Sequence, residues 1–239
     1  NFTARDFYVR QDSPFHSPLD LMGRRLGLYS WSASGAIWYR HFLTWSGLDL
    51  GAVNWTVGEV DVPQIGRAGG PLPTHVQAAP AGRSLSELLL EGEIDVLGSP
   101  PRPTRYHPTK GPIRRLIADI RGTEARYFRD TGVYPPQHLV VLRRAVWERD
   151  RSLARRVTEA FQRNNAAFTA MISGFPYALP WQELEREATA AAMGEGWHDD
   201  GLEENRAVME QFCATAFAAG LTSRLISVDE YFAEYLQSE

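Results

Sequence analysis

The chain has 239 residues, of which 44% are hydrophobic and 23% are charged, and its formal net charge is −4. This composition is typical of a folded globular protein and excludes a disordered chain or a coiled-coil rod. The acidic balance argues against a nucleic-acid partner, no apolar run reaches the roughly 20 residues of a membrane helix, and a single cysteine excludes an internal disulfide.

The first half of the sequence alternates short strand-like runs with helical segments. Strands are expected over residues 6–10, 24–29, 53–57, 74–78 and 93–98. Helices are expected over residues 36–45 and 84–90, and a helical turn over residues 17–23. Alternating strands and helices of this length predict an α/β fold with a mostly parallel sheet.

From residue 119 onward the pattern becomes mainly helical. Helices are expected over residues 123–131, 152–175, 180–193, 203–219 and 227–236. The apolar run at residues 138–143 predicts a buried strand. Because a single strand cannot satisfy its own backbone groups, this half requires partner strands from residues 6–10, from a lost segment or from another chain.

Six segments spread over the chain form a recognisable set. They are SPLDLMGRRLG (17–27), LLLEGEIDVLGSPPRP (88–103), RRL (114–116), TGVYPPQHLVVLRR (131–144), GLEEN (201–205) and GLTSR (220–224). Together they resemble the family of 4,5-dihydroxyphthalate decarboxylase and its relatives with the type II periplasmic-binding-protein fold. The resemblance extends over essentially the whole chain, but it is more specific for the fold than for a reaction, because one scaffold serves both receptors and enzymes.

The resemblance implies two α/β lobes with mostly parallel sheets and a ligand in the cleft between them. It assigns residues 1–20 to a strand and crossover of lobe 1, residues 21–118 to lobe 2, and residues 119–239 to the mainly helical remainder of lobe 1. Members of this group have further residues before the position of Asn1. We therefore expect an incomplete first lobe and a missing N-terminal part, and a signal peptide cannot be judged.

A small-residue loop is expected between the strand at 24–29 and the following helix, where N–H groups at a helix start can face an anion. Ser30, Ser32 and Ser34 form a candidate carboxylate cradle, and ordinary N-capping by Ser32 or Ser34 is the alternative. Trp31 is either a stacking platform for an aromatic ligand or an apolar wall residue.

Ser99 and Arg102 follow the strand at 93–98 and are expected to face the same cleft. Arg102 is either a bidentate clamp for a carboxylate or an ordinary surface arginine. His138 is the candidate catalytic acid, since decarboxylation requires a proton at the ring carbon; a structural histidine bonded to backbone is the alternative. The histidines show no metal-ligand spacing, so we expect no metal and no cofactor.

These residues and the resemblance favour a cofactor-free decarboxylase, a bacterial lyase of the cytoplasm acting on an aromatic carboxylate such as 4,5-dihydroxyphthalate. The alternative is a periplasmic solute-binding protein that delivers a small organic acid or heterocycle to an ABC-transporter permease. A third hypothesis keeps the scaffold and changes the ligand to a pyrimidine or a thiamine-precursor-like heterocycle.

Overall fold

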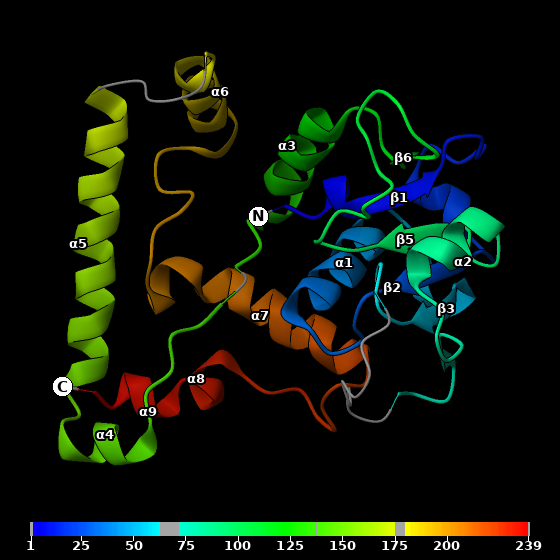
Figure 1. Ribbon diagram of the computed structural model, residues 1–239. Helices are drawn as coiled ribbons and strands as arrows, with labels where there is room; N and C mark the ends of the chain where they lie inside the picture. Colours follow the sequence, from blue (N-terminus) through cyan, green and yellow to red (C-terminus); the bar gives the residue numbers. More distant parts are fainter. Residues whose placement is uncertain (1, 63–71, 137, 175–179, 239) are drawn as a thin grey trace.

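The computed structural model describes residues 2–62, 72–136, 138–174 and 180–238 (Figure 1). Within them, a six-stranded sheet has the order β4-β3-β2-β5-β1-β6. The strands are Phe7–Arg10 (β1), Arg25–Leu28 (β2), Asn54–Val57 (β3), Val76–Ala78 (β4), Val96–Gly98 (β5) and Ile113–Arg115 (β6). Strands β2 to β5 are parallel, and β1 is antiparallel to β5 and β6. The predicted α/β class with a mostly parallel sheet is confirmed.

The helices follow the predicted order. The short 3-10 helices are Ala4–Asp6 (η1), Pro18–Leu21 (η2) and Leu50–Ala52 (η3). The α-helices are Ser34–Trp45 (α1), Leu85–Glu91 (α2), Ile120–Thr131 (α3), Arg144–Arg149 (α4), Leu153–Gly174 (α5), Gln182–Met193 (α6), Leu202–Ala218 (α7), Val228–Tyr231 (α8) and Ala233–Leu236 (α9). In the described residues, no helix combines the length and the apolar character needed to cross a membrane.

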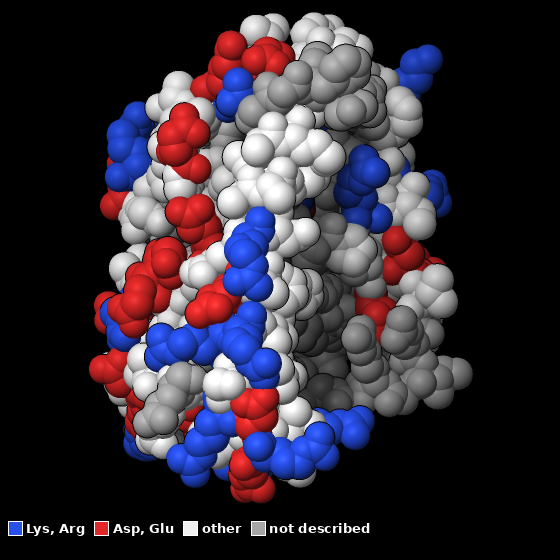
Figure 2. Space-filling model, turned by 90° about the vertical axis from the view of Figure 1, so that its left-hand side faces the viewer, with Lys and Arg blue, Asp and Glu red and all other residues white. Residues whose placement is uncertain are grey.

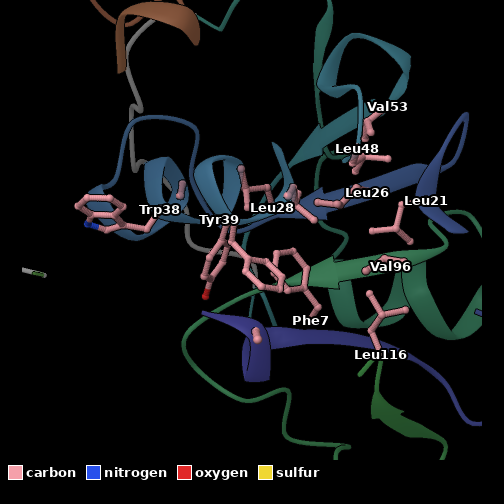
Figure 3. Packing of buried hydrophobic residues seen from close by; sticks show 14 of the residues in the cluster. Phe7, Leu21, Leu26, Leu28, Trp38, Tyr39, Leu48, Val53, Val96 and Leu116 are labelled. Atoms are coloured by element: carbon pink, nitrogen blue, oxygen red, sulfur yellow. The ribbon is translucent and has the colours of Figure 1, made fainter. Parts of the chain in front are cut away.

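The sheet separates two apolar cores, because successive strand residues point to opposite faces. Phe7 and Val96 pack toward α1, in the cluster that Figure 3 shows, whereas Tyr8 and Leu97 pack toward α2. Gly27 in β2 faces the α2 side, where a side chain would meet Ile94. The two helices therefore cover opposite faces and hold the central strands in register.

Residues 138–143 do not form the predicted buried strand. They have no strand pairing, and Val140 and Val141 are 65% and 83% exposed. The prediction was wrong because an apolar run shows only that a strand is suitable there, whereas a strand also needs a neighbour to bond. The sequence analysis also did not predict strand β6 or helix α4, and α4 directly follows this run.

The predicted division at residues 20 and 21 falls within one sheet. Strand β1 lies between β5 and β6, with Tyr8 opposite both Leu97 and Arg115. Residues 7–10 thus share a sheet with strands of the segment 21–118 in this structure. The assignment of residues 1–20 and 119–239 to lobe 1, and of residues 21–118 to lobe 2, stays a prediction.

Helix α5 stands at the left side of the molecule in Figure 1, away from the sheet. Phe161, Phe168 and Met171 are about half exposed. Its polar side contacts the segment after α6, where Asn165 donates to the carbonyl of His198 at 2.8 Å. Figure 2 shows the face of the molecule on this side, where charged side chains of both signs are mixed with uncharged ones.

Asp119 caps the N-terminus of helix α3, and the contribution of this cap to stability can be tested. The Asp119 carboxylate accepts a hydrogen bond from the Gly122 N–H at 2.9 Å. We expect Asp119→Ala to lower the free energy of unfolding by about 1 kcal/mol. In the control Asp130→Ala, an acid is removed near the C-terminus of the same helix, where the dipole disfavours it, so stability should be unchanged or slightly higher. Urea unfolding measures both; equal losses would contradict the assignment.

Candidate functional site

Three chain segments meet at the carboxyl edge of the sheet. Because β2 and β5 pair in parallel with Leu28 opposite Gly98, the loops that begin at Tyr29 and Ser99 leave the sheet side by side. Strand β1 runs the other way, so its first residues come to the same edge, and the Ser99 N–H donates to the Asp6 carbonyl at 3.0 Å. The two predicted ligand loops, residues 30–35 and 99–102, therefore share one edge of the sheet.

The serines of the loop between β2 and α1 do not act as the N-cap of α1. The Ser30 hydroxyl accepts from the Ala33 N–H at 3.2 Å and stabilises the turn. Ala33, rather than Ser32 or Ser34, is the N-cap of α1, Ser34 is the first helical residue, and Ser32 is exposed. N-capping by Ser32 or Ser34 is thus not the arrangement here, and their role in a carboxylate cradle stays a prediction.

The loop after β5 has one buried and one exposed candidate. Ser99 is fully buried and its hydroxyl donates to the Pro101 carbonyl at 2.9 Å, which closes a turn. Arg102 is exposed at the same turn. Arg102 is therefore open to an incoming anion, whereas the Ser99 side chain contributes to the shape of the loop.

Trp31 is buried rather than presented to solvent, and its role toward a ligand stays a prediction. Its ring lies edge-on to Trp55 and His75, with centroids 5.5 and 5.7 Å away. The Arg40 guanidinium lies 4.2 Å from the centre of the same ring, and its Nη2 donates to the Trp31 carbonyl at 2.8 Å. Burial lowers the pKa of Arg40 to about 10, so the group stays charged at neutral pH.

A pair of buried carboxyl groups lies at the β1 end of this edge. The Tyr39 hydroxyl on α1 donates to the Asp6 carboxylate at 2.9 Å, and Arg5 Nε lies 3.6 Å from it. Figure 3 shows Tyr39 directed from α1 toward the start of β1. Burial raises the pKa of Asp6 to about 6, although Tyr39 and Arg5 favour its charged form.

The second carboxyl group of the pair is Glu124 on α3. Burial raises its pKa to about 7, a hydrogen bond from the Arg5 backbone lowers it, and the charge of Asp6 raises it further. Its Oε1 is buried without a hydrogen-bond partner. Two acids that titrate close to neutral pH at one sheet edge are typical of a proton-transfer site.

His138 is exposed. It comes two residues after Pro136, whose carbonyl accepts from Trp38 Nε1 at 2.9 Å. Consecutive Cα positions limit the Cα of His138 to about 7 Å from that of Pro136. Its role as the catalytic acid stays a prediction.

Sequence reasoning missed Asp6, Tyr39 and Arg40. The signal for Arg40 was its position: residues 36, 40 and 43 lie on one helix face, and the other two are the apolar Ala36 and Leu43. A charge on the buried face of an amphipathic helix requires a reason. No comparable signal marked Asp6, because its depth depends on pairing with strands about ninety residues away.

Two hollows lie along the C-terminal half of α1. One, of about 480 Å³, includes His16, Trp45 and Arg126. The other, of about 380 Å³, lies between α1 and α7 and includes Arg40 and Thr215. Neither is lined by residues 30–34 or 99–102. In the described ranges, no three histidine, cysteine or acidic side chains are grouped to hold a metal ion.

The raised pKa of Asp6 predicts a pH-dependent stability. The unfolded chain loses the Asp6 proton near pH 4 and the folded chain near pH 6, so folding becomes less favourable as pH rises through this interval. Because of Asp6, the free energy of unfolding of the wild type should fall between pH 4 and 7 by roughly 3 kcal/mol. Asp6→Asn keeps an acceptor for Tyr39 but has no proton to lose, so this fall should be absent in the variant.

The groups that face Asp6 are Tyr39, Arg5, Arg115 and Glu124, and all stay in the variant. Urea unfolding at several pH values measures the effect. Asp12→Asn, an exposed aspartate just past the other end of β1, is the matched control and should follow the wild type. Parallel pH profiles for wild type and Asp6→Asn would show that burial does not perturb Asp6.

Comparison with known proteins agrees with the resemblance seen in the sequence. No family model matches the chain. It is 28% identical over 238 residues to a protein named 4,5-dihydroxyphthalate decarboxylase from Comamonas testosteroni, a match that covers 97% of this chain and 72% of that protein. It is 28% identical over 134 residues to a protein of the same name from Pseudomonas putida, covering 54% of this chain and 51% of that protein.

Among solved structures, that of the periplasmic aliphatic sulphonate binding protein SsuA from Escherichia coli matches 95% of this chain with a TM-score of 0.48 and 13% sequence identity. The chain spans 64% of that protein, which is less than two thirds of its length. By sequence, the chain is similar along nearly its whole length to one protein named 4,5-dihydroxyphthalate decarboxylase, and along about half of its length to a second protein of that name.

Proposed function

We propose that the chain forms part of a decarboxylase-like enzyme that acts on an aromatic carboxylate such as 4,5-dihydroxyphthalate. The observation that carries the proposal is the buried Asp6 carboxyl, with its pKa near 6, at the sheet edge that the two predicted ligand loops share. The names of the two curated relatives supply the substrate class.

The chemistry requires one proton and no redox step. When an acid protonates the ring carbon that bears the carboxylate, that carbon becomes tetrahedral. The C–C bond then breaks, CO₂ leaves, and the electron pair returns to the ring. Hydroxyl groups on the ring stabilise the protonated intermediate. A carboxylic acid whose pKa is raised toward neutral pH is a suitable proton donor for this step.

Asp6 is the donor in this proposal, and Glu124, whose pKa is raised by the charge of Asp6, is the candidate group to replace its proton. Tyr39 holds one carboxylate oxygen at 2.9 Å, which orients the group and stabilises the anion left after transfer. Burial and the neighbouring Asp6 raise the pKa of the Tyr39 phenol, so it stays a hydrogen-bond donor throughout. His138, the catalytic acid that the sequence analysis favours, is the competing donor.

CO₂ release from 4,5-dihydroxyphthalate between pH 5 and 8 tests the donor. A positioned general acid contributes roughly 10²–10⁴ in rate, so Asp6→Asn should reduce kcat by at least about a hundredfold. Wild-type kcat should fall as pH rises above 6, because Asp6 then loses its proton. Asp12→Asn is the control and should keep full activity.

Two results would contradict this assignment. Loss of turnover in His138→Gln with full turnover in Asp6→Asn would transfer the role to His138. Tight binding without CO₂ release at any pH would instead favour the solute-binding alternative.

The exposed loop residues provide a separate binding test. Ser32 and Arg102 lie at the same edge and are both exposed, so replacing them should leave the fold intact. We expect Ser32→Ala with Arg102→Ala to weaken phthalate binding by ~1–3 kcal/mol in calorimetric titration. Unchanged affinity would remove both residues from the ligand site.

A further inference from the structure

Arg5 is a partly exposed cation beside the buried acid of the proposed reaction. Its Nε lies 3.6 Å from Asp6 Oδ1, and its side chain is 44% exposed, whereas that of Asp6 is 10% exposed. The other carboxylate oxygen, Oδ2, accepts the buried hydrogen bond from the Tyr39 hydroxyl. The oxygen left to carry a proton is therefore the one beside Arg5, and an anion that approaches it from solvent meets the Arg5 guanidinium.

The guanidinium of Arg5 has donors to spare. Among the described residues it makes no side-chain hydrogen bond, because its separation of 3.6 Å from Asp6 is longer than such a bond. The backbone of the same residue is fixed, since its N–H donates to the Glu124 carboxylate. An anchored residue thus presents a free, planar fork of N–H groups, which is the shape that pairs with a carboxylate through two parallel bonds.

The second arginine that acts on Asp6 is Arg115, and it is already committed. Its guanidinium lies 5.4 Å from the centre of the Tyr106 ring, and its Nε is buried. In β6 it stands opposite Tyr8, so its side chain belongs to the face of the sheet that packs on α2. Of these two arginines, Arg5 is the one that is open to a ligand.

The position of Arg5 suits a particular arrangement of carboxylates on the substrate. In a phthalate, two carboxylates are attached to adjacent ring carbons. If Asp6 protonates the carbon that bears one of them, the second carboxylate lies one ring position away, beside the acid. A cation next to Asp6 can contact it there. In terephthalate the second carboxylate lies at the opposite end of the ring, out of reach of that cation.

We propose that Arg5 binds the carboxylate that the aromatic substrate retains, and that it thereby selects benzene-1,2-dicarboxylates over their 1,4-isomers. The inference rests on the proposed function, because it takes Asp6 as the proton donor. Arg5 keeps its proton throughout, and the carboxylate that it holds leaves with the product. The bond that breaks is still the one between the ring and the other carboxylate.

Binding of this carboxylate also has a consequence for the acid. The groups around Asp6 are Tyr8, Tyr29, Tyr39, Arg5, Arg115 and Glu124. A bound anion adds a negative charge beside Asp6 and takes up part of the favourable field of Arg5, and both effects raise the pKa of Asp6 above its value of about 6 in the free protein. The ligand should therefore draw a proton onto the protein as it binds.

Calorimetric titration of the full chain with phthalate, which lacks the ring hydroxyl groups that the reaction requires, tests the contact. Arg5→Met should weaken phthalate binding by at least about tenfold. Arg5→Lys keeps the charge but loses the fork, so its affinity should be intermediate. Arg10→Met is the matched control at the other end of β1, where Arg10 pairs with Asp12, and it should bind like the wild type.

Two measurements on the wild type keep the test decisive if Arg5→Met fails to fold. Terephthalate should bind at least about tenfold more weakly than phthalate, because it cannot reach Arg5. Titration at about pH 6.5 in two buffers of different ionisation enthalpy should show net proton uptake with phthalate, and Asp6→Asn should reduce that uptake.

Three results would overturn the proposal: equal phthalate affinity in wild type and Arg5→Met, equal affinity of the wild type for phthalate and terephthalate, or phthalate binding without proton uptake. The decarboxylase assignment fails by a different measurement, the absence of CO₂ release from 4,5-dihydroxyphthalate. Phthalate binding that depends on Arg5 would remain in that case as the property of a dicarboxylate receptor.

Discussion

The candidate site depends on how three strands are paired. Strand β2 pairs in parallel with β5, and β1 lies antiparallel on the other side of β5. Parallel strands bring their carboxyl ends to one edge, and an antiparallel neighbour brings its amino end to the same edge. The register with Leu28 opposite Gly98 places two loops side by side, and β1 adds Asp6 to them. A loop moved by one position along either strand would separate these groups.

Three ionisable groups are buried near this edge without being paired to one another. Asp6 and Glu124 lie on the β1 side, and Arg40 lies behind the loop that follows β2. Tyr29 lies between, close enough to feel both Asp6 and Arg40. Burial without mutual neutralisation costs stability. It leaves an acid whose pKa is raised to about 6, and a cation that has no ion pair within the described part of the chain. Both conditions are useful to a protein that binds and protonates an anion.

Periodicity and turn residues predicted the α/β class, five of the strands and most of the helices, because each depends on local pattern. The pattern failed at residues 138–143, since an apolar run does not show whether a neighbouring strand exists. Sequence segments predicted the relationship with named decarboxylases and the two loops at one edge. They did not predict Asp6, because its burial arises from pairing with Ser99, which is distant in sequence. Arg40 left a visible signal, a charge on an apolar helix face.

The uncovered run at Leu139, Val140 and Val141 has a consequence for handling the polypeptide. It contains two β-branched valines and pairs with no strand of the described residues, so another extended segment could add to it. The half-exposed phenylalanines of α5, Phe161 and Phe168, add further exposed apolar surface. The isolated polypeptide should therefore aggregate more strongly as its concentration rises, and ligand titrations are best performed at low protein concentration.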